Sequence, residues 1–146
     1  MKGGRPVVSG IVLETSDEGV RLADRFDLIS DIHEDFAQQL ATLWGDLQSK
    51  FAAAVLPDAV VVRAMDFFVG RSNRGGNAQK RFCAEGVILA VVRGRVKHTF
   101  WLTGNEIAAR CGMTKDAVEA KALEVVPKGP KEAAAAALAA LRVTNV

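Results

Sequence analysis

Apolar residues recur along the chain with two periods, one typical of strands and one typical of helices. Near the amino end, residues 7–14 and 20–28 are rich in β-branched and apolar side chains, and the segment between them, "TSDEG", is polar. This pattern predicts an antiparallel hairpin closed by a short turn. In its second strand, alternate side chains face opposite sides, which is typical of a sheet with one half-solvated face.

A long apolar stripe follows the hairpin and predicts the clearest helix of the chain. Its members recur at intervals of three or four residues, which is the α-helical period. Asp31, with Glu34 three residues later, resembles a capping box at its start, and Pro57 marks its far boundary. Trp44 widens the stripe. The stripe consists of Ile32, Phe36, Leu40, Leu43, Leu47 and Phe51.

Strand and helix patterns alternate over the rest of the chain. Two short runs predict strands, and a largely apolar segment between them predicts a well-buried helix. Three helical pieces complete the chain, separated by "CGM" and by the breaker "PKGP". This order predicts a single α/β domain, residues 1–146, in which a mixed β-sheet carries helices packed on its faces. The expected strands are residues 59–65 and 96–102, and the expected helices are residues 78–92, 105–110, 114–125 and 131–142.

The composition excludes several classes of protein. With 49% apolar and 25% charged residues, the chain matches soluble globular proteins and not disordered, collagen-like or coiled-coil ones. Its formal net charge of +2 is too small to indicate a nucleic-acid binder by itself. Cys83 and Cys111 lie in helical segments without the spacing of a zinc or redox site, so we expect reduced core residues. No apolar run reaches the length of a membrane span, and we expect a cytoplasmic protein.

Several segments occur in an order and spacing typical of one superfamily. "SGIVLE" and "EGVRL" are similar to its second and third strands, residues 31–54 to its first helix, and "PDAVVVR" to its central fourth strand. "NAQKRFCAEGVILAVVRGRV" is similar to a helix in which a glycine, here Gly86, precedes small apolar residues. "FWLTGNEIAARCGMTKDAV" has Lys115 at the lysine position, and "PKEAAAAALAALR" is similar to the last helix. The chain thus resembles the RNase H-like superfamily and, within it, the RuvC-type Holliday junction resolvases.

The resemblance implies two-metal phosphodiester hydrolysis, in which carboxylates hold two Mg²⁺ ions about 4 Å apart. Mg²⁺ requires oxygen ligands, which neither Arg nor Ala side chains supply. The family's first strand, with its Gly-Ile-Asp-like motif, has no counterpart in this sequence. The acid at the end of the fourth strand aligns with Arg63, and the last helix has only Glu132 near its start. We therefore expect an RNase H-like domain that lacks the usual catalytic carboxylates and the first strand.

Arg63 stands where the resemblance places a metal ligand, and its charge has the opposite sign. A guanidinium at the carboxyl edge of a sheet supplies positive charge, as a metal ion would, and it stays protonated at ordinary pH. It could therefore bind a phosphate without cutting it. The alternative is that Arg63 pairs with a local acid, such as Asp66 or Glu85, and simply closes the sheet edge.

A basic loop follows the same strand. The segment "GRSNRGGNAQKR" contains no acid, and ligands of open α/β folds bind at the carboxyl ends of strands. Its glycines would let the backbone approach a phosphate, and the helix that opens at Asn77 would favour anions. The alternative is a solvated loop. The four cations of this segment that we single out are Arg71, Arg74, Lys80 and Arg81.

A helix-turn-helix is a rival interpretation of the segment "IAARCGMTKDAV". Ala108, Gly112 and Val118 supply the small residue, the glycine turn and the apolar residue of that motif. The second helix has charges of alternating sign and no cationic face, so two ordinary helices are the alternative. His33 and His98 have no partner at metal-binding spacing.

We therefore predict a noncatalytic, RuvC-like protein that binds the backbone of DNA or RNA and needs no cofactor. One alternative is a Mg²⁺-dependent nuclease that uses displaced acids. Another is a structural module, such as a homodimer, with the Ala-rich last helix and Trp44 or Trp101 at an interface. The residues expected to bind nucleic acid are Arg63, Arg71, Arg74, Lys80, Arg81 and Lys115. The displaced acids are Glu14, Asp24, Asp66, Glu85 and Glu132.

Overall fold

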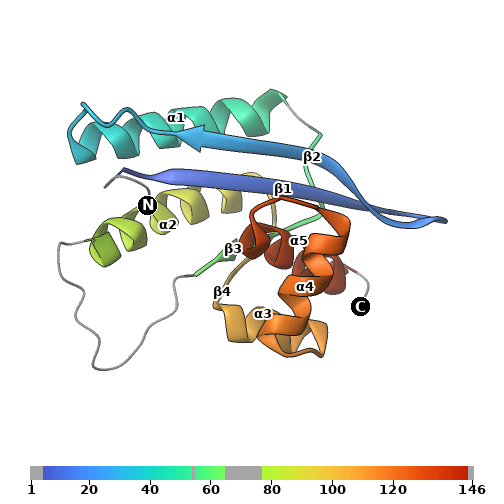
Figure 1. Ribbon diagram of the computed structural model, residues 1–146. Helices are drawn as coiled ribbons and strands as arrows, with labels where there is room; N and C mark the ends of the chain where they lie inside the picture. The colour runs from blue at the N-terminus through green and yellow to red at the C-terminus, as the bar shows by residue number, and fades with distance from the viewer. Residues whose placement is uncertain (1–4, 54, 65–76, 145–146) are drawn as a thin grey trace.

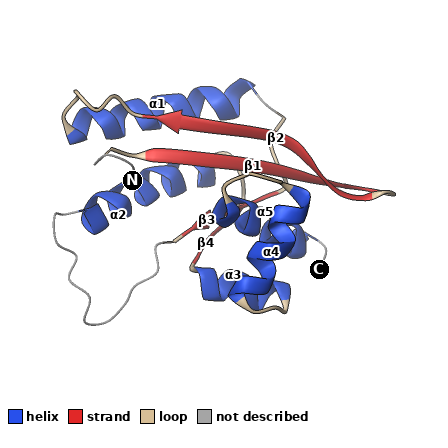
Figure 2. Cartoon of the chain, viewed as in Figure 1, coloured by secondary structure: helices blue, strands red, loops and turns tan. Residues whose placement is uncertain are grey.

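The computed structural model describes residues 5–53, 55–64 and 77–144 (Figure 1). Strands and helices follow one another as the hydrophobic pattern predicts, so the mixed α/β class is confirmed (Figure 2). No helix among these residues is both long and apolar enough to cross a bilayer. The elements in chain order are β1 (Val7–Ser16), β2 (Gly19–Ile29), α1 (Phe36–Ala53), β3 (Ala59–Arg63), α2 (Asn77–Arg93), β4 (His98–Leu102), α3 (Gly104–Cys111), α4 (Lys115–Val125) and α5 (Lys131–Thr144).

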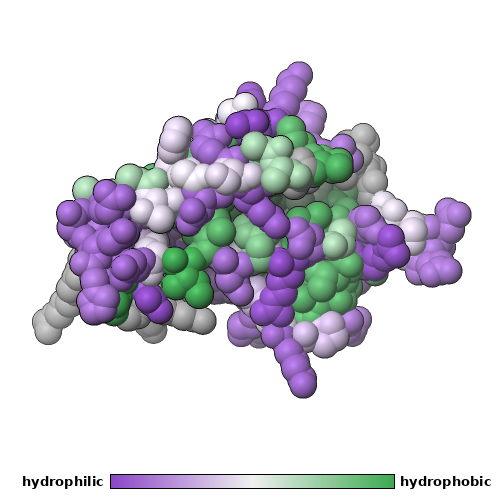
Figure 3. All heavy atoms as spheres, turned by 90° about the horizontal axis from the view of Figure 1, so that it is seen from above, coloured by the Kyte–Doolittle hydropathy of each residue, from purple (hydrophilic) through white to green (hydrophobic). Residues whose placement is uncertain are grey.

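The expected hairpin is formed by β1 and β2. The two strands run antiparallel, from Val7 opposite Ile29 to Ser16 opposite Gly19, with a β-bulge after Val12. Gly19 has a φ of 110°, which only glycine adopts without strain. This glycine therefore lets β2 begin immediately after the tight turn. The end of the hairpin is exposed, and its surface is largely hydrophilic (Figure 3). The part of the hairpin farther from its turn therefore packs against the helices.

The second strand pair, β3 and β4, is parallel. Ala59 lies opposite His98, and Arg63 lies opposite Leu102. Among the described residues the strands form two separate two-stranded sheets, so β1 and β3 share no ladder of hydrogen bonds. Antiparallel and parallel pairing are both present, as expected. Packing against helices, in place of backbone hydrogen bonds, joins the two pairs.

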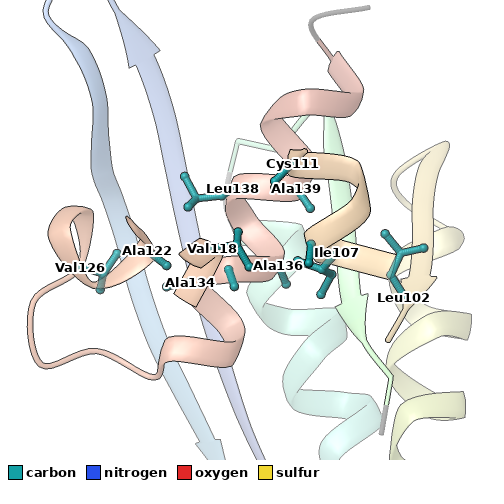
Figure 4. Close-up of a cluster of buried hydrophobic side chains, with 12 residues drawn as sticks. Leu102, Ile107, Cys111, Val118, Ala122, Val126, Ala134, Ala136, Leu138 and Ala139 are labelled. Atoms are coloured by element: carbon teal, nitrogen blue, oxygen red, sulfur yellow. The ribbon is translucent and has the colours of Figure 1, made fainter. Parts of the chain in front are cut away.

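Helix α5 contacts both β1 and β3. Its buried face consists mainly of alanines, and Ala134 and Ala139 are fully buried. Because these side chains are small, the helix can approach the strands and helices α3 and α4 closely. Ile11 of β1 and Val61 of β3 pack against the same cluster. Figure 4 shows the alanines of α5 among side chains of α3, α4 and β4, including Val118.

A second hydrophobic cluster lies on the other face of the strands. Leu43 and Leu47 of α1 pack with Val91 of α2. Val8 of β1 packs here, whereas Ile11 of the same strand packs on the α5 side, because successive side chains of a strand point to opposite faces. The molecule therefore has three layers: α1 with α2, the strands, and α3 to α5.

The expected capping box at Asp31 and Glu34 is wrong. The Asp31 carboxylate accepts a hydrogen bond from the His33 backbone N–H at 2.9 Å, which makes a local turn and not a helix start. Asp35 precedes α1 instead, and its carboxylate accepts a hydrogen bond from the Gln38 N–H at 2.8 Å. The helix therefore begins later than the apolar stripe predicts.

Two side chains that the pattern assigns to buried positions lie at the surface. Trp44 is 53% exposed, and Cys83 is exposed because α2 buries only part of its circumference. Cys111 is buried, and both thiols are free. Burial raises the pKa of the Cys111 thiol, and the charges of Arg142 and Lys121 oppose this effect. The core position is confirmed for Cys111 and wrong for Cys83.

The tight contact of α5 leads to a prediction about stability. Ala139 is fully buried, so a larger side chain there has no space. We expect Ala139→Leu to lower the free energy of unfolding by about 1–3 kcal/mol, the usual cost of overpacking. Urea unfolding followed by circular dichroism measures the change. Ala137→Leu, at a partly exposed position of the same helix, is the control, and equal losses in both variants would contradict the argument.

Candidate nucleic-acid interface

Arg63 is the last residue of β3, and strand alternation directs its side chain to the α5 side, as for Val61. There its Nη2 atom lies 3.8 Å from Glu132 Oε1, in the first turn of α5. Its Nη1 atom donates a hydrogen bond to the backbone oxygen of Ala64. The Arg63 side chain is only 9% exposed. The carboxyl end of β3 therefore holds a largely buried guanidinium.

Gly104 makes room for this guanidinium. It begins α3 directly after β4, and the Ala64 N–H donates to the Leu102 oxygen at 2.7 Å, which keeps the two strand ends together. A β-carbon at Gly104 would lie 2.7 Å from Arg63 Nη2 and 2.8 Å from Lys115 Cε. Because the glycine has no side chain, cationic side chains from β3 and α4 can both pack on the start of α3.

A second arginine connects α2 to the same acid. Arg81 Nη2 lies 3.9 Å from Glu132 Oε2, and Arg81 Nε lies 3.4 Å from Glu85 Oε2. Glu85 is buried, and its other oxygen accepts a hydrogen bond from Trp101 Nε1 at 2.9 Å. Glu132 therefore lies between two guanidinium groups, those of Arg63 and Arg81. We name the following set the Arg63 cluster: Arg63, Arg81, Glu85, Lys115 and Glu132.

The Arg63 cluster has three cations and two carboxylates, so one positive charge remains. The two acids differ in exposure: the side chain of Glu85 is 6% exposed and that of Glu132 is 48% exposed. A buried carboxylate needs its partners, so Glu85 orders Arg81 and Trp101. Glu132 lies just beyond hydrogen-bond distance of both guanidinium groups. It is therefore the acid that an incoming anion can most easily replace.

The structure brings three of the six predicted binding residues together. Lys80 neighbours Arg81 on α2 but faces another direction, and its Nζ atom lies 5.5 Å from the centre of the Phe36 ring on α1. Successive residues of a helix point about 100° apart, which separates these two cations. The three residues that meet are Arg63, Arg81 and Lys115. Arg71 and Arg74 lie outside the described residues.

Among the described residues, the acid that pairs with Arg63 is Glu132, which the position of Arg63 in the sequence did not suggest. Glu85 pairs with Arg81, and Asp66 lies outside the described residues. Glu132 approaches Arg63 from α5, far along the chain. The sequence feature that could have pointed to Glu132 is that it is the only acid of the last helix. Neither the role of Gly104 nor the Trp101–Glu85 hydrogen bond was predicted, because each joins different elements.

The Arg63 cluster does not fit a divalent metal ion. Its two carboxylates, Glu85 and Glu132, each lie within 4 Å of a guanidinium nitrogen. A divalent cation between them would be repelled by Arg63 and Arg81 and would find few of the oxygen ligands that Mg²⁺ needs. In the part of the chain that the structure describes, no three His, Cys, Asp or Glu side chains lie close enough to hold a metal.

Two of the displaced acids belong to the hairpin. Glu14 of β1 forms an ion pair with Arg21 of β2, and Asp24 accepts a hydrogen bond from Lys50 of α1 at 3.0 Å. The hydrogen bond from Lys50 lowers the pKa of Asp24, because it stabilises the ionised carboxylate. Both acids therefore pair with cations that do not belong to the Arg63 cluster.

The helix-turn-helix pattern contributes to the core. Ala108 and Val118 are buried in the α5 cluster. Gly112 has a φ of 65° and ends α3, so that the chain can turn into α4. The small residue, glycine and apolar residue thus serve the packing of α3 and α4 on α5. DNA reading through this element stays a prediction.

Comparison with known proteins identifies the fold. No protein-family model and no curated relative matches the chain. The chain is similar in structure to Thermus thermophilus RuvC, with a TM-score of 0.66 and 16% identity, over 96% of this chain and 96% of that one. It is also similar to T. thermophilus RuvC in complex with a Holliday junction substrate, with a TM-score of 0.60 and 15% identity, over 94% and 92%. The expected RNase H-like, RuvC-like fold is confirmed, and at this identity the likeness concerns the fold alone.

The crowding at Gly104 leads to a second prediction about stability. Gly104→Ala would push the ends of Arg63 and Lys115 away from the start of α3. We expect a loss of about 1 kcal/mol in the free energy of unfolding, at the low end of overpacking costs because these side chains are flexible. Gly86→Ala on α2 is the matched control, since nothing lies within 4 Å of its β-carbon position. This control should gain about 0.5–1 kcal/mol, and an equal gain at Gly104 would refute the crowding.

Proposed function

We propose that this protein binds the phosphate backbone of DNA or RNA without cutting it, with the Arg63 cluster at the centre of the binding surface. The observation that carries the proposal is the guanidinium of Arg63 at the carboxyl end of β3, beside an exposed acid. The fold supports it, because one RuvC-like neighbour is bound to a Holliday junction substrate. Binding of this kind needs no metal, since the cations belong to the chain.

The proposed binding step is an exchange of anions. A guanidinium forms two parallel hydrogen bonds to a phosphate, whereas the Glu132 carboxylate lies 3.8 Å away from Arg63 Nη2. A backbone phosphate would displace Glu132 from between Arg63 and Arg81. Lys115, at the start of α4, would contribute charge beside it. Lys80, Arg71 and Arg74 remain predicted phosphate contacts outside the Arg63 cluster.

This exchange predicts opposite effects for the two members of one ion pair. Glu132→Gln removes the competing anion, and we expect it to tighten DNA binding roughly threefold, the size of one exposed charge interaction. Arg63→Gln removes the phosphate partner and should weaken binding about tenfold or more. Glu124→Gln, an equal charge change at an exposed position of α4, is the control. Gel shifts with branched, duplex and single-stranded DNA measure the affinities.

The same experiment separates binding from a purely structural role. If Arg63 only closes the sheet edge, Glu132→Gln and Glu124→Gln will bind alike, and that result rejects the exchange. Backbone binding must also weaken as salt rises, because counterions are released. Affinity that is indifferent to salt and to the double change Arg71→Gln and Arg74→Gln would refute backbone binding altogether.

A metal-dependent nuclease is the second candidate function. It is favoured by one observation, namely that two carboxylates, those of Glu85 and Glu132, both lie within 4 Å of Arg81 nitrogens and so come together at one place. A metal ion could bind there only if the Arg81 guanidinium moved away from both acids. For the noncatalytic protein we expect no cleavage of branched, duplex or single-stranded DNA in Mg²⁺ or Mn²⁺. Cleavage that disappears on changing Glu132→Gln or Asp66→Asn, but persists in Glu124→Gln, would establish the nuclease and overturn the noncatalytic proposal.

A further inference from the structure

A second group of cations surrounds a cavity between the hairpin and the connection from α4 to α5. The cavity has a volume of about 330 Å³. The connection passes beside β1, as Figure 1 shows. None of its charged residues belongs to the Arg63 cluster. We name it the Lys128 cavity, and its charged lining residues are Arg5, Arg25, Asp27 and Lys128.

The hairpin supplies one wall of the Lys128 cavity. Arg25 and Asp27 are two residues apart on β2 and so point to the same face. Ser9 of β1 lies opposite Asp27, and its hydroxyl donates a hydrogen bond to the Asp27 carboxylate at 2.6 Å. Arg5 is tied to the end of β2, since its Nη1 atom donates to the Ser30 oxygen at 3.3 Å. The hairpin, together with Arg5 just before it, thus sets two cations and one partly engaged acid around the cavity.

A tight turn supplies the other wall and the third cation. Val126 is 1% exposed and accepts a hydrogen bond from the Gly129 N–H at 3.1 Å. A β-carbon at Gly129 would lie 2.4 Å from Val126 Cγ1, so the turn requires glycine at this close approach. Lys128, between these two residues, has a φ of 61°. The position of Lys128 is therefore set by a turn that is anchored in the core.

The charge around the cavity is unbalanced. Three cations face one carboxylate, which leaves two net positive charges. Among the described residues, neither Arg25 nor Lys128 takes part in an ion pair. Like charges held around one cavity repel each other, and a bound anion would offset that repulsion. The amino end of α5, which begins at Lys131, adds a further positive potential close by.

We propose that the Lys128 cavity binds one phosphate group, either free or as part of a nucleic-acid backbone. Its volume is at the lower end of the range for small-molecule sites, which suits a phosphate with its water and not a large ligand. In the backbone case the inference rests on the proposed function. Lys128 lies four residues before Glu132, so their Cα atoms are at most about 15 Å apart. One strand of nucleic acid can therefore reach both sites.

A titration of the full chain with inorganic phosphate tests the site directly. We expect the backbone amide signals of Ser9 and Gly129 to shift in NMR spectra, and the shifts to disappear in the double variant Arg25→Gln and Lys128→Gln. The matched control is Arg93→Gln with Lys97→Gln, which removes the same charge from exposed positions outside the cavity. Asp27→Asn removes the acid of the cavity and should tighten phosphate binding roughly threefold.

Binding of duplex DNA to the same variants identifies the source of the phosphate. If the cavity takes a backbone phosphate, Arg25→Gln with Lys128→Gln weakens DNA binding more than its control. It also makes the slope of log K against log salt shallower by about 0.9, the value for one phosphate contact. If the cavity takes free phosphate, the double variant and the control bind DNA equally.

Two results would overturn the site. One is the absence of phosphate-dependent shifts around the cavity, and the other is equal shifts in the double variant and its control, with circular dichroism showing both to be folded. The proposed function fails separately. If the chain shows the phosphate titration but binds no DNA, the phosphate site in the Lys128 cavity stands and the proposed nucleic-acid binding is refuted. If the chain binds DNA but shows no phosphate titration, the phosphate site is refuted and the proposed nucleic-acid binding stands.

Discussion

The close approach of α5 to both strand pairs is the contact on which the rest of the structure depends. Among the described residues, β1 and β3 have no hydrogen-bond ladder between them, so side-chain packing holds the hairpin and the parallel pair in one layer. Ala134 and Ala139 are small enough to let the helix lie directly on the strands. Each contact is weak, but their sum is large because dispersion acts between every pair of packed atoms.

The same helix decides where charges meet. Its first turn carries Glu132 to the guanidinium groups of Arg63 and Arg81, and the turn before it carries Lys128 to the hairpin. The Arg63 cluster and the Lys128 cavity therefore both lie near the amino end of α5, where the helix dipole is positive. Packing and electrostatics are linked through one element. A shift of α5 against the strands would disturb both sites at once.

A fixed guanidinium and a bound metal ion are different centres of charge. A divalent ion lowers the pKa of a bound water and so generates a nucleophile, which an arginine cannot do. A largely buried arginine also needs a compensating charge, and Glu132 supplies it from a partly exposed position. This arrangement supports the exchange of one anion for another. Hydrolysis would require an activated water as well as positive charge.

The sequence by itself determined the order and type of the elements, because hydrophobic period, turn residues and helix breakers act over a few neighbouring residues. It also placed Arg63 at the end of a strand and Glu132 in the last helix. Only the tertiary structure decided that Asp35 and not Asp31 caps α1, that Cys83 is exposed, and that Arg63 meets Glu132. The Arg63 cluster could be predicted only in part, since its residues come from β3, α2, α4 and α5. Which residues become neighbours depends on how elements far apart along the chain pack together, and a local sequence pattern does not contain that information.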